Sequence, residues 1–290
     1  MVRTRFVCVS DTHGYSTADA GFRLPKGDVL IHAGDITNRG SAEELDRSLK
    51  WISAADFEVK IVIAGNHDIL LDPNYPENNG LPSTDRPREL PTMYFEGDMS
   101  SQFVYLNHEA KEICLAKPNG PKSVFKVFGS PYSPLLEGWG FGYRPDQANS
   151  LWDDIPGDTD VLITHTPPED HLDIRKGKSV GCEALRRRLG EVRPRLAVCG
   201  HVHESRGYHR VHWANESNEE RDTVVGSLPG QQSRKQSTID LCRGSRLDND
   251  GWQRNETCIV NAAILATSWP HKGGKKFNSP IVVDLDLPQS

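Results

Sequence analysis

Short runs of apolar and β-branched residues recur along the chain, and most of them end in a histidine, an aspartate or a glycine. Six runs have this form: RFVCVSDTH (5–13), DVLIHAGD (28–35), KIVIAGNHD (60–68), VFKVFGSPY (124–132), DVLITHTPP (160–168) and LAVCGHVH (196–203). Four to six apolar residues bounded by turn formers predict buried strands. Two further strands are predicted by CIVNAAILATSW (258–269) and PIVVDLDL (280–287).

Two stretches between the strands have the apolar spacing of helices. In 41–55 the pattern predicts a helix with Ser41 as its N-cap and Glu44 three residues later. A second helix is predicted within 182–192. Alternating strands and helices are typical of an α/β fold, in which ligands bind at the carboxyl ends of the strands.

Two polar stretches interrupt this order. Residues 72–98 are rich in proline, asparagine and glycine and predict a long surface loop, whereas 214–256 have mixed charge and no apolar period. The second stretch therefore predicts an insertion that leaves the fold or is partly disordered. No stretch is a linker long enough to separate two domains, so we expect 1–290 to form a single domain with a polar insertion at about 214–256.

Composition narrows the class of protein. The chain has 290 residues, of which 36% are hydrophobic, enough to bury a sizeable core. Its net charge of −6 argues against tight binding to long nucleic acid or to an anionic membrane. We find no run of 18 apolar residues and no secretory signal at the N-terminus. We therefore expect a soluble, cytoplasmic protein, and the sequence does not specify its oligomeric state.

The cysteines and two of the histidines are expected to have structural rather than chemical roles. The six cysteines form no C-x-x-C pair, which disfavours a thiolate zinc site, and Cys8 and Cys199 lie in apolar runs where burial is expected. Of the histidines outside the recurring motifs, we expect His32 to lie in the core and His108 to lie on the surface.

Oxygen and nitrogen donors gather at the ends of five of the predicted strands. They are Asp11 and His13, Asp35, Asn66 and His67, His165, and His201 and His203. Bringing these groups together is costly unless a cation neutralises them, so the pattern predicts a metal site. Carboxylate, imidazole and amide donors without thiolate suit manganese, iron or zinc in a non-structural site.

The spacing of the donors refines this prediction. Residues two apart on an extended strand point the same way, so Asp11 and His13 can bind one ion. The same applies to His201 and His203, although a loop could instead direct them to two ions. With one bridging carboxylate, two ions would lie about 3.5–4 Å apart, as in two-metal hydrolases.

Five motifs in this order resemble the calcineurin-like metallophosphoesterase superfamily. They are S-D-T-H (10–13), G-D-I-T-N-R-G (34–40), G-N-H-D (65–68), T-H-T-P-P (164–168) and G-H-V-H (200–203). Longer segments such as GSPYSPLLEGWGFGY (129–143) are similar to its metallophosphoesterase-domain-containing branch, which is related to class III phosphodiesterases. The resemblance implies an α/β fold, a four-layer αββα sandwich of two mixed β-sheets flanked by helices.

The same resemblance implies a role for each donor. The implied ligands are Asp11, His13 and His203 for one metal ion, Asn66, His165 and His201 for the second, and Asp35 as the bridge. His67 would not bind metal but would stabilise or protonate the leaving oxygen, oriented by a carboxylate. A water held between two transition-metal ions (Mn²⁺, Fe²⁺/Fe³⁺ or Zn²⁺) would lose a proton near neutral pH and attack phosphorus in line.

The sequence says less about the substrate. Besides Asn66 and His67, the residues expected to contact it are Tyr132 and Trp139, whose rings could stack on a base or an aryl group. These aromatic residues could instead fix their loop to the sheet. The resemblance favours a phosphodiesterase acting on small cyclic-nucleotide or aryl diesters. The alternatives are the same chemistry on a phosphomonoester or a non-phosphate ester or amide, and a nucleotide-binding regulatory protein of low turnover.

Overall fold

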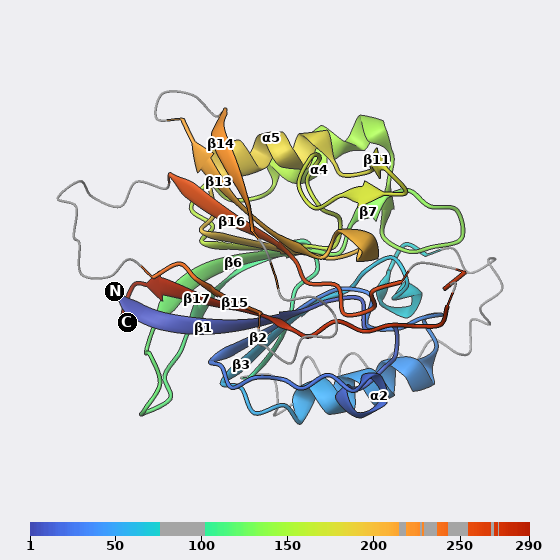
Figure 1. The fold of residues 1–290 in the computed structure, drawn as a ribbon, viewed down its shortest axis with the longest axis horizontal. Coiled ribbons are helices and arrows are strands. Elements are labelled where there is room, and N and C mark those ends of the chain that lie inside the picture. Colours follow the sequence, from blue (N-terminus) through green and yellow to red (C-terminus); the bar gives the residue numbers. More distant parts are fainter. Residues whose placement is uncertain are drawn as a thin grey trace.

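The structure is a sandwich of two β-sheets with helices on both outer faces (Figure 1). It is a computed structural model that describes residues 1–75, 102–214, 219–226, 228, 237–242, 255–267, 270–271 and 273–290. Among these residues, one sheet has six strands and the other has seven. This arrangement confirms the four-layer αββα fold.

The first sheet contains the strands at the beginning and end of the sequence. Its order is β15 (Ser237–Asp240), β17 (Ile281–Leu287), β1 (Val2–Val9), β2 (Val29–Ala33), β3 (Val59–Ile63) and β4 (Phe103–Tyr105). Strands β1 to β4 run parallel to one another, whereas β17 runs antiparallel to β1. The sheet is therefore mixed, and the carboxyl ends of β1, β2 and β3 lie at one edge.

The second sheet is also mixed. Its order is β14 (Glu220–Gly226), β13 (Gly207–Trp213), β16 (Glu256–Asn261), β12 (Leu196–Cys199), β9 (Val161–Thr164), β6 (Val124–Ser130) and β5 (Glu109–Cys114). The four central strands, β16, β12, β9 and β6, are parallel, and antiparallel strands lie at both ends. Two small sheets pair β7 (Ser133–Pro134) with β8 (Gly142–Tyr143) and β10 (Ile174–Arg175) with β11 (Lys178–Ser179).

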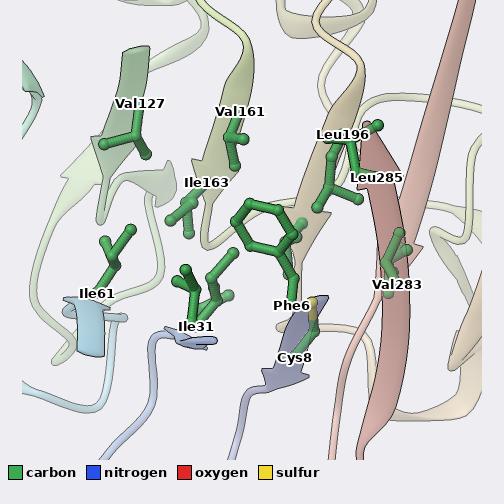
Figure 2. Packing of buried hydrophobic residues seen from close by; sticks show 14 of the residues in the cluster. Phe6, Cys8, Ile31, Ile61, Val127, Val161, Ile163, Leu196, Val283 and Leu285 are labelled. Atoms are coloured by element: carbon green, nitrogen blue, oxygen red, sulfur yellow. The ribbon is translucent and has the colours of Figure 1, made fainter. Parts of the chain in front are cut away.

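The main core lies between the two large sheets. Figure 2 shows Phe6, Ile31 and Ile61 of the first sheet packed toward Val127 and Val161 of the second. All five side chains are buried. Because these strands are covered on both faces, their sequences are continuous apolar runs rather than alternating ones.

Helices cover the outer faces. Helix α2 (Ala42–Ser53) packs on the first sheet, and α4 (Ala148–Asp153) and α5 (Glu183–Val192) pack on the second (Figure 1). The short helix α1 (Thr17–Ala20) follows β1. The structure confirms both predicted helices and Ser41 as an N-cap, since its side chain accepts from the Glu44 amide at 3.2 Å. The Glu44 carboxylate, however, accepts from the amides of Asn38 and Arg39.

The polar stretch 214–256 contains two strands that the sequence pattern did not predict. Strand β14 forms an edge of the second sheet, and its Val224 and Val225 side chains are 50% and 71% exposed. Because an exposed edge strand need not be apolar, β14 lacks the apolar run by which a buried strand is recognised. The expectation that this stretch leaves the fold or is partly disordered does not hold for β14 and β15, which belong to the two large sheets. Positions 215–218, 227, 229–236 and 243–254, and 76–98 of the predicted loop, lie outside the described residues. The single-domain organisation stays a prediction.

The two ends of the chain lie side by side. Val2 at the start of β1 pairs with Leu287 at the end of β17, and Figure 1 shows both termini at the same edge of the sandwich. Within the described residues, none of the helices is long and apolar enough to cross a membrane.

Candidate metal centre

The predicted donors meet where parallel strands of both sheets end. Strands β1, β2 and β3 lead to Asp11, Asp35 and Asn66, while β9 and β12 lead to His165 and His201. All five residues are buried or nearly so. Two sheets packed face to face therefore direct their carboxyl ends toward one small volume.

The first group of donors contains Asp11, His13 and His203. The His203 Nε2 atom lies 3.3 Å from the Asp11 Oδ1 atom and 3.1 Å from the His13 Nε2 atom. One ligand atom from each of the three residues lies within 4.8 Å of the others. The His203 Nδ1 donates to the Thr267 carbonyl oxygen at 3.1 Å, so in a neutral ring Nε2 carries a lone pair.

The second group is centred on Asn66. Its Oδ1 atom lies 2.9 Å from the His201 Nδ1 atom and 3.1 Å from the His165 Nε2 atom. The His165 Nδ1 donates to the Ala33 carbonyl oxygen at 3.0 Å. In a neutral ring, the His165 Nε2 lone pair is therefore directed at oxygen atoms rather than at hydrogens.

Asp35 lies between the two groups. Its Oδ1 atom is 3.3 Å from the His165 Nε2 atom, and its Oδ2 atom is 3.7 Å from the His13 Nε2 atom. The carboxylate thus faces one histidine of each group, which is the position expected of a bridging ligand. Asp35 also forms one set of close ligand atoms with Asp11 and His165.

The donor set fits metal ions. Carbonyl acceptors hold the protons of His165 and His203 on Nδ1, so lone pairs, carboxylate oxygens and an amide oxygen face one another in a buried volume. Acceptors so close together repel one another unless a cation lies between them. Ligating histidines commonly donate their second nitrogen to a backbone carbonyl, as these two do.

Burial and the Asp35 carboxylate act in opposite directions on the histidines: the pKa values of His13 and His201 suit metal binding, whereas that of His165 reflects its pairing with Asp35. Burial lowers the pKa of His13 and of His201 to about 3, which favours their neutral, ligating forms. Burial alone would lower the pKa of His165 as well, but the nearby charge of Asp35 raises it to about 9. Burial would raise the pKa of the Asp35 carboxyl, but the charges of His165 and His67 outweigh it and hold this pKa well below its usual value.

Four donor residues have left-handed backbone conformations. The φ angles are +51° for Asp11, +45° for His13, +52° for Asp35 and +65° for His201. Such conformations cost a non-glycine residue on the order of 1–3 kcal/mol each. Hydrogen bonds maintain them: the His13 amide donates to the Asp35 carbonyl at 3.0 Å, and the His201 amide donates to the Asp11 carboxylate at 3.0 Å.

The glycines of the motifs allow this close approach. A Cβ atom at Gly65 would overlap the Asp35 side chain and amide nitrogen, and one at Gly200 would overlap the side chains of Ser10 and Asp11. The sequences G-N-H and G-H-x-H therefore need glycine because the ligand carboxylates lie against the neighbouring backbone.

His67 lies at the open side of the group. Its side chain is 22% exposed, and its Nε2 atom is 4.0 Å from the Asp35 Oδ2 atom. The His67 Nδ1 donates to the Asn38 carbonyl oxygen at 2.6 Å. A backbone carbonyl rather than the expected carboxylate therefore accepts from Nδ1, while Nε2 faces the Asp35 carboxylate, which also accepts from the His67 amide at 2.9 Å.

Trp139 packs directly on His67. The two ring centroids are 3.8 Å apart and the planes differ by 32°. The loop is fixed there because the Gly140 amide donates to the Asn66 carbonyl at 2.9 Å and the Tyr75 hydroxyl donates to the Gly138 carbonyl at 3.0 Å. The structure thus brings the predicted residue Trp139 to the site.

Tyr132, the other predicted aromatic contact, has different neighbours. Its ring lies 5.2 Å from that of His108 and 6.1 Å from that of Phe141. His108, expected on the surface, is half-buried: its side chain is 16% exposed and its Nε2 atom lies 3.3 Å from the exposed Asp154 carboxylate. His32 is buried and hydrogen-bonded to the Thr12 hydroxyl at 2.9 Å, which confirms it as a core residue.

The sequence pattern did not single out Asp68 as a site residue, although it completes the G-N-H-D motif. Its buried carboxylate accepts from the amides of Gly65 and Thr37 at 2.8 Å and of Ile36 at 3.1 Å. Burial, reinforced by the charge of Asp35, raises its pKa to about 6. Asp68 therefore ties the loop after β2 to the loop after β3, and its position beside Asn66 and His67 was the available signal.

Comparison with known proteins defines the class. Residues 4–205 match the family model described as calcineurin-like phosphoesterase, and the chain belongs to this family. The family match agrees with the aspartate and histidine groups of the structure that could hold metal.

The chain spans less than two thirds of the length of the relatives described next. The chain is 38% identical to metallophosphoesterase domain-containing protein 1 of Homo sapiens over 216 residues, 70% of this chain and 62% of that protein. It is 40% identical to probable rhamnogalacturonate lyase C of Emericella nidulans over 211 residues, 72% of this chain but 18% of that protein. The solved purple acid phosphatase PPD1 from yellow lupin seeds aligns with 92% of this chain and 46% of its own, at 13% identity and a TM-score of 0.40.

Proposed function

We propose that this protein is a dinuclear metal-dependent phosphodiesterase that hydrolyses small phosphodiesters carrying a cyclic-nucleotide or aryl group. The observation that carries the proposal is the convergence of carboxylate, imidazole and amide acceptors on both sides of Asp35. The ligands in this proposal are Asp11, His13 and His203 for one ion, Asn66, His165 and His201 for the other, and Asp35 for both. The metals would be manganese, iron or zinc.

The bound ions would neutralise charge on the phosphoryl group and lower the pKa of water. The protein groups supply the remaining steps. Asn66 and His67, adjacent at the end of β3, contact the phosphate in this proposal. The Asn38 carbonyl holds a proton on the His67 Nδ1 atom, so a second proton on Nε2 makes an imidazolium that can donate to the leaving oxygen.

Trp139 supports the proposed preference for a flat substituent. Its ring packs on His67, so an aromatic leaving group protonated by His67 would lie beside an aromatic surface. Tyr132 stays a weaker prediction as a substrate contact, because its ring packs on His108 and Phe141.

We further propose that the protein acts in the cytoplasm on small phosphoesters, without long nucleic acid or a membrane as partner. All six cysteines are free in the structure, which is typical of a reducing compartment. The net charge of −6 disfavours a polyanionic partner.

The test combines metal content with a paired assay. We expect about two equivalents of transition metal per chain by mass spectrometry and faster hydrolysis of bis(p-nitrophenyl) phosphate than of p-nitrophenyl phosphate. Faster hydrolysis of the monoester would favour a phosphomonoesterase. Two bound metals without hydrolysis of either ester would favour a non-phosphate substrate or a regulatory binding protein. Absence of bound metal after reconstitution would overturn the proposal.

A further inference from the structure

A segment near the end of the sequence returns past the metal centre. Leu265 pairs with Phe277 in an antiparallel bridge, and the Ala266 amide donates to the Lys276 carbonyl at 2.8 Å. We call residues 273–277, which run back toward β17, the Lys275 segment. It lies outside residues 4–205 that match the family model, so the family match does not account for it.

The chain leading to this segment touches the metal centre. The Thr267 carbonyl accepts from the His203 Nδ1, and the Thr267 hydroxyl is hydrogen-bonded to the His271 Nδ1 atom at 3.0 Å. Burial lowers the pKa of His271, and the charges of Lys275 and His203 lower it further. Thr267 therefore connects His271 to a proposed metal ligand, and the His271 carbonyl accepts from the amide of Gly274, the residue before Lys275, at 2.8 Å.

Lys275 is held by a residue next to the first metal group. Its Nζ atom donates to the Tyr15 hydroxyl oxygen at 2.7 Å and lies 4.7 Å from the centroid of the Tyr15 ring. Tyr15 follows His13 by two residues, and its amide donates to the Thr12 carbonyl at 2.9 Å. Phe277 packs on the Tyr15 ring at 5.1 Å, which fixes the ring.

The charge of Lys275 is available to a ligand. A lysine ammonium has three N–H donors, and the Tyr15 hydroxyl, a neutral group, accepts one of them. Lys275 and its neighbour Lys276 are both exposed, and neither forms an ion pair with a carboxylate in the described part of the chain. In a chain with a net charge of −6, this places positive charge without a carboxylate partner beside Tyr15, two residues after the proposed ligand His13.

We propose that Lys275, positioned by Tyr15, binds a second anionic group of the substrate that takes no part in the reaction. The preferred substrate would be a phosphodiester whose retained arm carries a further phosphate or carboxylate. This inference rests on the proposed phosphodiesterase function and deepens it, because it names a charged group as the feature that the site selects. Lys275 acts through binding alone and donates no proton to the reacting atoms.

The test uses two substrates that differ only in a remote phosphate. They are the p-nitrophenyl ester of thymidine 5′-phosphate and the same ester with a 3′-phosphate. Wild-type protein should hydrolyse the 3′-phosphorylated ester with roughly five-fold or greater advantage in kcat/KM, the effect of one charge pair in water. Lys275→Met should abolish this advantage through KM. Tyr15→Phe should reduce it, because the ammonium loses its hydroxyl partner.

Lys276→Met is the matched control. It removes an equal charge from the adjacent residue but leaves the contact between Lys275 and Tyr15 intact, so the advantage should persist. An advantage that falls equally in both lysine variants would indicate a general electrostatic effect and overturn the assignment to Lys275. Equal rates on both esters in the wild-type protein would overturn the inference and leave the proposed function standing.

A binding measurement separates the two proposals. Calorimetry would compare the Kd of thymidine 3′,5′-bisphosphate with that of thymidine 5′-monophosphate in the metal-loaded protein. Tighter binding of the bisphosphate, abolished in Lys275→Met, would support the subsite. This would hold even if neither ester were hydrolysed, and the absence of hydrolysis would then refute only the phosphodiesterase proposal. Equal Kd values would overturn the subsite.

Discussion

His67→Ala provides the sharpest test of the proposed chemistry. The substitution removes the ring whose Nδ1 donates to Asn38 and whose Nε2 lies 4.0 Å from Asp35 Oδ2. General acid catalysis by a positioned side chain typically contributes about 10²- to 10⁴-fold, or about 3 to 5 kcal/mol. We expect kcat to fall within this range while the metal content stays near that of the wild-type protein.

The leaving group decides where in that range the loss falls. A p-nitrophenolate leaves readily without protonation, so His67→Ala should cost least on bis(p-nitrophenyl) phosphate. An alkyl leaving group needs a proton, so an alkyl phosphodiester should show the larger loss. Rates would be measured on both substrates with metal-loaded protein, together with metal content by mass spectrometry.

A second variant serves as control. His212→Ala makes the same chemical change on β13, where the side chain is 26% exposed and pairs with Asp222. It should leave kcat unchanged on both substrates. An equal loss on aryl and alkyl esters in His67→Ala would refute proton donation by His67, and loss of metal in this variant would instead identify His67 as a ligand.

Three further predictions follow from other contacts. Asp35→Asn removes a carboxylate oxygen between the two groups, so bound metal should fall below one equivalent per chain; two retained equivalents would contradict a bridging role. Chelation should lower Tm, because the facing acceptors lose the cation between them, and added Mn²⁺ should restore it; an unchanged Tm would refute metal binding. The Glu220 carboxylate contacts His171 at 2.8 Å and Arg186 at 3.0 Å, and although burial opposes ionisation these contacts lower its pKa from 4.5 to about 2. Its stabilisation is therefore present above pH about 4.5 and lost as the pH falls toward 2. Glu220→Gln should lower the free energy of unfolding by about 1 kcal/mol at pH 7 and by less at pH 3, as urea unfolding would show; an equal difference at both pH values would exclude the charge as the cause.

The sequence predicted the positions of the donors because two simple rules combine at the strand ends. Apolar runs mark buried parallel strands, and the carboxyl ends of parallel strands meet at one edge. Asp11, Asp35 and His165 could therefore be placed together before any distance was known. Their roles as metal ligands stay predictions that the proposed experiments test.

Other features carry no signal in the side-chain pattern. Backbone carbonyls of Asn38 and Thr267 orient His67 and His203, and any residue type supplies a carbonyl. Lys275 and Tyr15 are 260 positions apart, so only the folded chain brings them together. Strand β14 was missed because an exposed edge strand tolerates charged residues that a central strand excludes.

The pairing of Val2 with Leu287 has a consequence for how this chain can be joined to other sequences. Strand β1 runs from the edge that holds both termini to the edge that holds Asp11, so both ends lie away from the candidate centre (Figure 1). A fusion partner at either end would be attached at the edge opposite the candidate centre. Joining the two ends with a short linker and opening an exposed turn elsewhere would give a circular permutant that keeps the register of β1 and β17.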